Sequence, residues 1–432
     1  MKNIPEIRIK GFEGEWKESV LQENLADNLR TNTLARAFLS DNDGEVLNVH
    51  YGDVLIKYDS LLNAAKDDIP HIKGSKAKDY SDFIQDGDII FADTAEDETA
   101  GKCVEVINVG NNNIVSGLHT IACRPKHTFG KGFLGYYINS PKYHEQLYPL
   151  LQGIKVFSLN KSQLEQTEMR TPESLAEQQS LGSFFSSFDR LLSDHHRRLE
   201  NLRRVKKSML QKMFPQQGQT VPEIRFKGFG GEWEKLLLGD LLDDNIKTNT
   251  FSRALLSDGN GEVLDIHYGD ILIKFDSVLN VADVKIPHIT GSKAKDFNCY
   301  LQDGDIIFAD TAEDETAGKC IEIENIGNKY LVSGLHTIAC RPNKVIGKGF
   351  LGYYLNSPNY HNQLLPLMQG IKVFSINKMP LKQTFVQLPS SVDEQRRIGS
   401  FFTSLANLIN DEVNYIDQLT RVKSTLLQKM FV

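Results

Sequence analysis

The sequence predicts an α+β fold: two α/β globules in a pseudo-two-fold arrangement, separated by two long helices that form a coiled coil. Three observations support this prediction. The 432-residue chain contains one unit written twice. Each copy opens with short β-rich runs punctuated by Gly and Asn. Each copy closes with a long stretch in which apolar residues recur every three or four positions, the period of a helix.

The two copies align without a gap. Residues Gln85–Cys103 return letter for letter at Gln302–Cys320, and the openings at Ile4 and Val221 have the same offset of 217 (221 − 4). A period this long indicates a duplicated domain rather than a solenoid. Two equal halves are expected to pack like an isologous dimer about a pseudo-two-fold axis.

The first part of each copy is predicted to be the globule. Runs such as Asp53–Lys57 and Asp88–Ala92 are apolar, short and bounded by polar or turn residues, as strands are. A polar stretch bounded by prolines is the expected linker between the copies. The predicted domains are a globule over 1–173, a long helix over 174–214, the linker 215–222, a second globule over 223–390 and a second long helix over 391–432.

The last part of each copy is predicted to be one long helix. Ser174 and Glu177 match a capping box, which marks a helix start, and Ser391 and Glu394 repeat it. A helix from 177 to 214 would be roughly 57 Å long at 1.5 Å per residue, so its expected partner is its own copy. The predicted seam comprises Phe188, Leu192, His195, Leu199, Leu202, Val205, Met209 and Met213, with Leu405, Ile409, Glu412, Ile416, Leu419, Val422, Leu426 and Met430 in the second copy.

The composition is that of a cytoplasmic globular protein. Hydrophobic residues make up 40% and charged residues 24% of the chain, and no apolar run is long enough to span a bilayer. The first residues lack the apolar core of a signal peptide. Five cysteines, an odd number, indicate reduced thiols rather than a disulfide framework. We therefore expect no membrane partner.

The charge distribution leaves two interpretations open. A net charge of −7 argues against a protein that holds DNA by charge alone. The segment Arg197–Lys212, however, carries seven Lys or Arg residues against the single acid Glu200. This basic stripe is either a solvated helix face or a contact to phosphates.

Several motifs occur twice and in the same order. They are the openings PEIRIKGFEGEW and PEIRFKGFGGEWEKLLLGD, the runs GDVLIK and QDGDIIF, the helix starts EQQSLGSFF and EQRRIGSFF, and the helix ends VKKSMLQKMF and VKSTLLQKMF. With these motifs the chain resembles, over its whole length, the specificity subunits of type I restriction-modification systems. Each piece is weak alone, but the repeated order is highly specific.

The resemblance implies a DNA-recognition subunit without a catalytic site of its own. It implies two target-recognition domains, each reading one half of a bipartite double-stranded DNA target, and long helices that pair antiparallel as a spacer. Two methyltransferase subunits would dock on this chain, and two restriction/translocase subunits would complete the enzyme. No cofactor is expected in this chain, because the family's S-adenosylmethionine, ATP and Mg belong to the other subunits.

Candidate DNA contacts are polar residues that survive in both copies. Lysines on phosphates would set the register, while side chains on base edges would carry specificity. For each of these residues the alternative is a surface side chain without a role. The candidates are Lys57, Lys76, Lys78, Thr94, His119, Lys131, Lys155 and Lys161, and in the second copy Lys274, Lys293, Lys295, Thr311, His336, Lys348, Lys372 and Lys378.

Other chemistry is less well supported. The acidic run Ala92–Lys102 could hold a nuclease metal, although a solvated loop is the favoured interpretation. Cys103, His119 and Cys123 could bind zinc, but no fourth ligand is evident, so buried thiols and a loop histidine are favoured. The Gly-Lys pair at 101–102 is followed by Cys103, which excludes a phosphate-binding loop.

The duplication also predicts the form of the target. No Asn-Pro-Pro-aromatic motif of adenine methyltransferases occurs, so methylation by this chain is not expected. Two like readers on a two-fold axis meet the two DNA strands in opposite directions. The expected target is therefore an interrupted palindrome, and a truncated half of the chain, residues 1–217, could dimerise to read it. The alternatives are a metal-dependent nuclease and a stand-alone repressor or scaffold.

Overall fold

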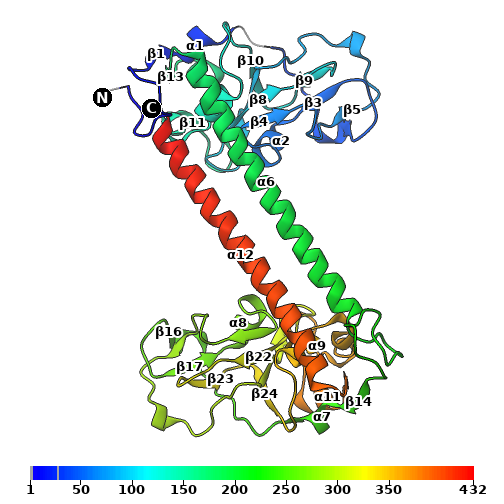
Figure 1. Cartoon of the computed structure of the whole chain (residues 1–432). Helices are drawn as coiled ribbons and strands as arrows, with labels where there is room; N and C mark the ends of the chain where they lie inside the picture. The colour runs from blue at the N-terminus through cyan, green and yellow to red at the C-terminus, as the bar shows by residue number, and fades with distance from the viewer. Residues whose placement is uncertain (1–2, 27–28) are drawn as a thin grey trace. The chain divides into compact units, whose positions relative to one another are not determined.

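The computed structural model describes residues 3–26 and 29–432 and divides into two compact units. Unit 1 comprises the chain up to His196 together with Tyr415–Val432, and unit 2 comprises Arg197–Asn414. Each unit therefore combines one globule with a segment of each of the two long helices, α6 (Leu175–Lys212) and α12 (Val392–Met430) (Figure 1).

The globule of unit 1 contains small sheets of mostly antiparallel strands. Only the pairs β4–β8 and β3–β9 are parallel among its described strands. The sheets are β1 (Lys17–Val20) with β13 (Glu168–Thr171); β10 (Thr120–Cys123), β6 (Ile89–Ala92), β8 (Cys103–Ile107) and β4 (Leu61–Asn63); β2 (Leu39–Ser40), β5 (His71–Ile72), β3 (Leu47–Val49) and β9 (Ile114–Ser116); and β11 (Leu151–Gln152), β12 (Phe157–Leu159) and β7 (Thr94–Ala95). Its short helices are α1 (Leu21–Asn24), α2 (Tyr51–Ile56), α3 (Phe133–Ile138), α4 (Pro141–His144) and α5 (Lys161–Leu164).

Unit 2 repeats this arrangement, with one additional short strand on its central sheet and, among the described residues, one strand fewer in the counterpart of the sheet of β11, β12 and β7. The sheets are β14 (Glu234–Leu237) with β26 (Phe385–Leu388); β15 (Leu242–Asp243), β24 (Thr337–Pro342), β20 (Ile306–Ala309), β22 (Cys320–Glu324) and β18 (Val278–Asn280); β16 (Leu256–Ser257), β19 (His288–Ile289), β17 (Val263–Ile266) and β23 (Tyr330–Ser333); and β21 (Thr311–Ala312) with β25 (Phe374–Ser375), which correspond to β7 and β12. Its short helices are α7 (Leu238–Leu241), α8 (Tyr268–Ile273), α9 (Phe350–Leu355), α10 (Pro358–His361) and α11 (Lys378–Lys382). The expected α+β class is confirmed.

One of the two predicted strands is a helix. The run at Asp88–Ala92 forms β6, but Asp53–Lys57 lies in α2 and its C-terminal cap, so the strand prediction there is wrong. The His50 side chain caps the start of α2 by accepting the amide of Gly52 at 3.3 Å. The ammonium of Lys102 caps its end by donating to the carbonyls of Leu55 and Tyr58, at 2.9 and 2.7 Å. Tertiary hydrogen bonds therefore override the strand propensity of this apolar run.

Each long helix starts at a clamp that joins two of the repeated motifs. The Glu177 amide donates to the Ser174 hydroxyl at 3.3 Å, as the capping box predicts. Its carboxylate, however, accepts two hydrogen bonds from Arg8, at 2.7 and 2.8 Å. Arg225 and Glu394 make the same pair at α12. The opening PEIR motif thus ties the start of the chain to the start of its helix.

Within each unit the segments of α6 and α12 pack antiparallel. In unit 1, Lys423 pairs with Asp189, and the rings of His195 and Tyr415 lie 4.6 Å apart. In unit 2, Arg198 lies 3.4 Å from the buried carboxylate of Glu412. Residue numbers therefore rise along one helix as they fall along the other, and the predicted antiparallel pairing is confirmed inside each unit.

The predicted seam is correct at most positions and wrong at one pair. Leu199 and Ile416 are buried with 6% exposure each. Val205 and Val422, however, are 44% and 48% exposed. The neighbouring lysine, Lys206, takes the seam position in unit 2 instead, where its ammonium pairs with Asp276.

The end of each long helix completes the core of the globule from the other copy. Phe431, which follows α12, is buried in unit 1, where its ring stacks on Phe185 at 5.5 Å. Phe214, which follows α6, is buried in unit 2 and stacks on Phe402 at 5.8 Å. The remaining aromatic neighbours are Trp16, Phe133 and Tyr137 around Phe431, and Trp233, Phe350 and Tyr354 around Phe214.

A buried carboxylate anchors the start of α3. Glu105, on β8, accepts the amides of Gly132 and Gly135 at 2.6 and 3.0 Å. Burial nevertheless raises the pKa of Glu105 to about 7. Glu322 makes the same two contacts at the start of α9, and its pKa is likewise raised to about 7 by burial.

Candidate nucleic-acid interface

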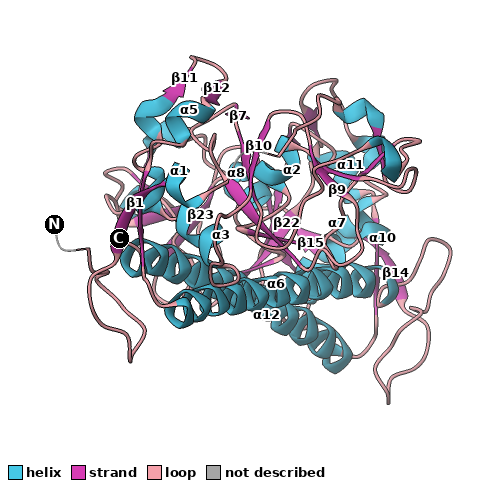
Figure 2. Cartoon of the chain, turned by 90° about the horizontal axis from the view of Figure 1, so that it is seen from above, coloured by secondary structure: helices cyan, strands magenta, loops and turns pink. Residues whose placement is uncertain are grey.

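A cluster of polar side chains lies at the N-terminal end of α2 in unit 1. We call it the His119 cluster; its members are Arg36, His50, Tyr51, Asp53, Asp93, Thr94 and His119. They converge from the 3-10 turn Arg36–Phe38, the start of α2, the start of β7 and the turn that leads into β10. In Figure 2, α2, β7 and β10 lie well away from α6.

One half of the cluster is an ion pair beside a capping histidine. Arg36 Nη1 lies 2.5 Å from Asp53 Oδ2, and the arginine side chain remains 58% exposed. His50, which caps α2, is buried, and burial lowers its pKa below the usual value. A guanidinium that is anchored by one carboxylate but still exposed can meet a second acceptor from outside.

The other half is built around His119. Its Nδ1 lies 3.4 Å from both Asp93 Oδ1 and Thr94 Oγ1, and the Thr94 hydroxyl donates to Asp93 at 2.7 Å. The ring of Tyr51 meets the His119 ring edge-on, with 5.3 Å between centroids. The His119 side chain is 47% exposed. The ring is therefore held on one side and open to solvent on another.

Unit 2 contains the same cluster with the same geometry. Arg253 Nη1 lies 2.5 Å from Asp270 Oδ2, and His336 Nδ1 lies 3.3 Å from Asp310 Oδ1. The ring of Tyr268 is again 5.3 Å from the histidine ring. The members are Arg253, His267, Tyr268, Asp270, Asp310, Thr311 and His336.

Of the predicted contact residues, the structure brings Thr94 with His119, and Thr311 with His336, into these clusters. Lys274 also reaches the second cluster, 3.4 Å from Asp270. Most other candidate lysines have acidic or amide partners: Lys57 with Asp68, Lys76 with Glu45, Lys131 with Asn108, Lys161 with Glu165, Lys348 with Glu324 and Lys378 with Asp244. The remaining candidates, Lys78, Lys155, Lys293, Lys295 and Lys372, are exposed.

Three cluster residues, the arginine and the two aspartates, are absent from the residues predicted to contact DNA. Arg36, Asp53 and Asp93 were not among the candidates, which favoured lysines. Their repetition could have identified them, because all three residues recur at the constant offset as Arg253, Asp270 and Asp310. Only the fold, however, brings residues 17 and 26 positions apart into contact.

The acidic run after β7 has a structural explanation. Asp97 accepts the amide and hydroxyl of Thr99 within a turn, and Lys102 caps α2. Cys103 and Cys123 are buried, and burial raises the pKa of the Cys123 thiol to about 12. Among residues 3–26 and 29–432 no three His, Cys, Asp or Glu side chains are grouped to hold a metal. The observed contacts favour a solvated loop and buried thiols.

The basic stripe on α6 is largely engaged within unit 2. Arg198 pairs with Glu412 and Lys206 with Asp276, while Lys212 lies 2.7 Å from Glu223. Arg203 pairs with Glu200 one turn earlier. These ion pairs favour a helix face that contacts its own unit over a phosphate-binding surface.

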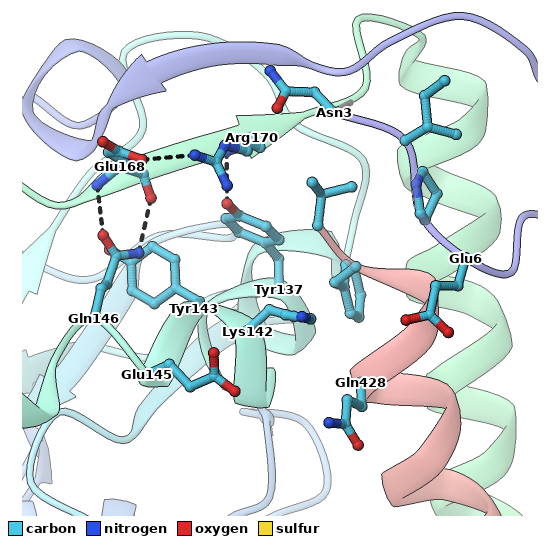
Figure 3. A pocket seen from close by; sticks show the side chains of 14 residues that line it. Asn3, Glu6, Tyr137, Lys142, Tyr143, Glu145, Gln146, Glu168, Arg170 and Gln428 are labelled. Carbon is cyan, nitrogen blue, oxygen red and sulfur yellow. Dashed lines mark hydrogen bonds and ion pairs between the residues drawn. The ribbon is translucent and has the colours of Figure 1, made fainter. Parts of the chain in front are cut away.

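A cavity beside the end of α12 is not part of the cluster. It has a volume of about 520 Å³ and is lined by residues that include Glu6, Lys142, Arg170 and Gln428 (Figure 3). In unit 2 the side chain of Asn359, the counterpart of Lys142, donates to the carbonyls of the chain leaving α6. The cavity therefore corresponds to the space that the linker crosses in unit 2.

Of the helices in the described part of the chain, none is both long enough and apolar enough to traverse a bilayer.

Comparison with known proteins agrees with this architecture. Residues 231–421 match the family model described as "Type I restriction modification DNA specificity domain". A putative type I restriction enzyme MjaX specificity subunit from Methanocaldococcus jannaschii is 23% identical over 387 residues, covering 85% of this chain and 83% of that protein.

Two solved structures share the fold over nearly the whole length. The type I restriction-modification S subunit from M. genitalium has a TM-score of 0.57 at 14% identity, covering 99% of both chains. A chain from work on complex assembly and conformational transition of the type I R-M system has a TM-score of 0.55 at 17% identity, covering 96% of this chain and 97% of that one.

The family match and the duplication reinforce each other. The matched segment lies in the second copy, and the first copy repeats it at a constant offset with identical cluster residues. The family is the non-catalytic specificity subunit of its system. Residues 231–421 therefore belong to the type I restriction modification DNA specificity domain family, and the first copy of the repeat carries the same sequence pattern.

Proposed function

We propose that the chain reads a bipartite double-stranded DNA target, one half-site per unit, through the His119 cluster and its copy in unit 2. The observation that carries this proposal is the recurrence of one half-exposed polar cluster in both units of a DNA-specificity protein. His119 and His336 are the proposed base-edge contacts, together with the arginines, and Thr94 and Thr311 are proposed DNA-site residues beside them. The lysines named above are the proposed phosphate contacts, which set the register.

The proposed target is an interrupted palindrome. All seven cluster residues are identical between the units, so the two readers present the same groups to DNA. Identical readers about a two-fold axis require inverted half-sites. The rival is that small differences, such as those between 126–129 and 343–346, change individual base preferences.

The long helices offer a surface for the methyltransferase subunits. In unit 1 the apolar residues Phe184 and Leu191 of α6 are 37% and 38% exposed, and Val422 of α12 is 48% exposed. In unit 2, Val205 and Leu408 are 44% and 48% exposed. Residues seven apart lie on one helix face, and such an apolar face suits a partner helix.

One such surface per unit supports docking of two methyltransferase subunits per chain. The two restriction/translocase subunits, and the placement of S-adenosylmethionine, ATP and Mg in the partners, follow from the family resemblance alone. Mass measurement of the co-purified complex tests the number. One chain with two methyltransferase subunits is expected, and a one-to-one ratio at saturating partner would contradict it.

Methylome sequencing tests the reading function. A host expressing the chain with its modification subunit should methylate two identical inverted half-sites around a non-specific spacer. Two unrelated half-sites would overturn the palindrome, while random methylation would overturn the reading role. Specific operator binding by the isolated chain, without a methyltransferase complex, would indicate a repressor instead. DNA cutting by the isolated chain with a divalent metal would indicate a nuclease.

A further inference from the structure

We propose that His119 reads one base of its half-site through its Nε2 atom, which accepts a hydrogen bond from an exocyclic amino group in the major groove. Asp93 and Thr94 are positioning residues for this contact, and His336 plays the same part in unit 2. The inference rests on the proposed DNA-reading function and deepens it by naming the side chain, the atom and the group that is read.

The backbone at His119 is held in an uncommon conformation. Its φ is +53°, in the left-handed region that few residues other than glycine adopt, and His336 has the same value. The turn is pinned on both sides, because Gly117 donates to the carbonyl of Val49 at 2.9 Å and Asp93 donates to the carbonyl of His119 at 3.1 Å. Surroundings that hold an unfavourable backbone conformation are typical of functional sites.

Three side chains contact the ring of His119. Tyr51 packs edge-on against it, and Nδ1 faces the carboxylate of Asp93 and the hydroxyl of Thr94, each at 3.4 Å. Because the Thr94 hydroxyl donates to Asp93, the carboxylate is itself oriented. The ring can rotate little without losing these contacts.

The position of the carboxylate determines which ring nitrogen carries the proton. A carboxylate beside Nδ1 can only accept, so it favours the tautomer with the proton on Nδ1. In that neutral ring Nε2 is an acceptor. The half-exposed side chain thus presents an acceptor, in a fixed direction, to whatever lies against the cluster.

Because Nε2 of His119 is an acceptor, it can form a hydrogen bond with a base but not with a phosphate. Phosphate oxygens are acceptors themselves, so they offer no proton to Nε2. In the major groove the donors are the amino groups of adenine N6 and cytosine N4. His119 therefore contributes specificity, whereas a lysine at the same place would contribute only register.

The first experiment uses His119→Asn in the full chain, expressed with its modification subunit. Asparagine tolerates the left-handed conformation, so the turn should be kept. Methylome sequencing is expected to show one relaxed position in one half-site, while the half-site read by unit 2 stays intact. His336→Asn should relax the equivalent position of the other half-site.

A matched control separates reading from general damage. His196, on α6, is an exposed histidine of the same unit and lies outside the cluster, so His196→Asn should leave the motif unchanged. Asp93→Asn should relax the same position as His119→Asn, because an amide no longer favours the proton on Nδ1. A merely structural role for Asp93 would instead weaken methylation at all positions together.

The second experiment removes the amino group from the DNA. In oligonucleotides, purine replaces adenine, or 2-pyrimidinone replaces cytosine, at the relaxed position. Binding by the wild-type complex should weaken by roughly 5- to 150-fold, the cost of one lost base contact. The His119→Asn complex should show no additional loss. If the His119→Asn complex methylates no DNA, the amino groups are instead removed one at a time at every position of the half-site. Binding of each oligonucleotide is then compared between the wild-type and Asp93→Asn complexes, and the position at which only the wild type loses affinity is the one read by His119.

Three results would overturn the inference. They are an unchanged motif in His119→Asn, relaxation of both half-sites by this single change, and a wild-type complex that tolerates loss of every amino group in the half-site. Failure of the proposed function is distinguishable, because the wild-type complex itself would then lack a methylation motif.

Discussion

Replacing Phe214 by alanine should destabilise unit 2, although Phe214 belongs to the first copy of the repeat. Its ring is fully buried, stacks on Phe402, and meets Tyr354 edge-on at 5.3 Å. Loss of a buried phenyl group costs about 3–5 kcal/mol, because both the apolar contacts and the packing are lost. We expect about 4 kcal/mol. For a unit of this size that corresponds to a fall of roughly 8–16 °C in unfolding temperature.

Hydrogen exchange resolved along the chain is the appropriate assay. Phe214→Ala should speed exchange in the globule of 223–390 and leave residues 3–173 protected. Phe431→Ala is the matched variant and should have the opposite distribution, because Phe431 completes the core of unit 1. Phe38→Ala is the control, since this phenyl group is 57% exposed and its loss should cost about 0.5 kcal/mol or less.

One pattern of hydrogen exchange above all would contradict the placement of Phe214 in the core of unit 2. If Phe214→Ala loosened the first globule and spared the second, the helix end would not belong to the core in which the structure places it. Equal loosening of both globules would show instead that the two units unfold as one body.

Three further predictions concern the seam, the buried carboxylates and the duplication. Leu199→Asp with Leu202→Asp should destabilise unit 2 by several kcal/mol in thermal unfolding, because it buries unpaired charge, while the exposed control Val205→Asp should change little; equal effects would contradict the seam. The pKa of the Glu105 carboxyl is higher in the folded protein than in the unfolded chain, so this group stabilises the fold at low pH. Its contribution to the free energy of unfolding should fall by about 3 kcal/mol between pH 4.5 and 7. Glu105→Gln should flatten this slope in pH-dependent unfolding, and an unchanged slope would contradict the prediction. Residues 1–217 alone should form a dimer in light scattering, because Phe214 of a second copy can take the place of Phe431; a well-folded monomer at micromolar concentration would disprove this.

The architecture was predictable because its signals are periodic. The duplication and the long paired helices follow from residue spacing, which can be recognised without knowledge of the fold, while the antiparallel direction of the pair follows from the family resemblance. The prediction of the seam is wrong at Val205 because the spacing of apolar residues does not identify a lysine whose aliphatic stem packs like an apolar side chain. Lys206 takes that place, with its ammonium on Asp276 and 5.8 Å from the centre of the Tyr353 ring.

The candidate site was only partly predictable for a related reason. Thr94 and His119 were found as repeated polar residues, but Arg36 and Asp53 form a site only once α2 is known to be a helix. That helix was predicted as a strand, because its capping contacts come from His50 and from Lys102, which is distant in sequence. The sequence also could not predict which globule the end of each long helix enters. Both copies carry the same aromatic residues around this position, so the apolar period fits either globule.

The exchanged helix ends have a consequence during synthesis on the ribosome. The first globule emerges early, but the segment 415–431 that closes its core is translated only after all of unit 2. At 5–20 residues per second that delay is on the order of ten to forty seconds. During this interval Trp16 and Phe133 lack their contacts with Phe431, so the nascent chain exposes an apolar aromatic surface. Chaperones that bind nascent chains are expected to cover this surface. The time at which the aromatic surface of the first globule is buried therefore depends on the order of translation and not on the stability of the finished protein.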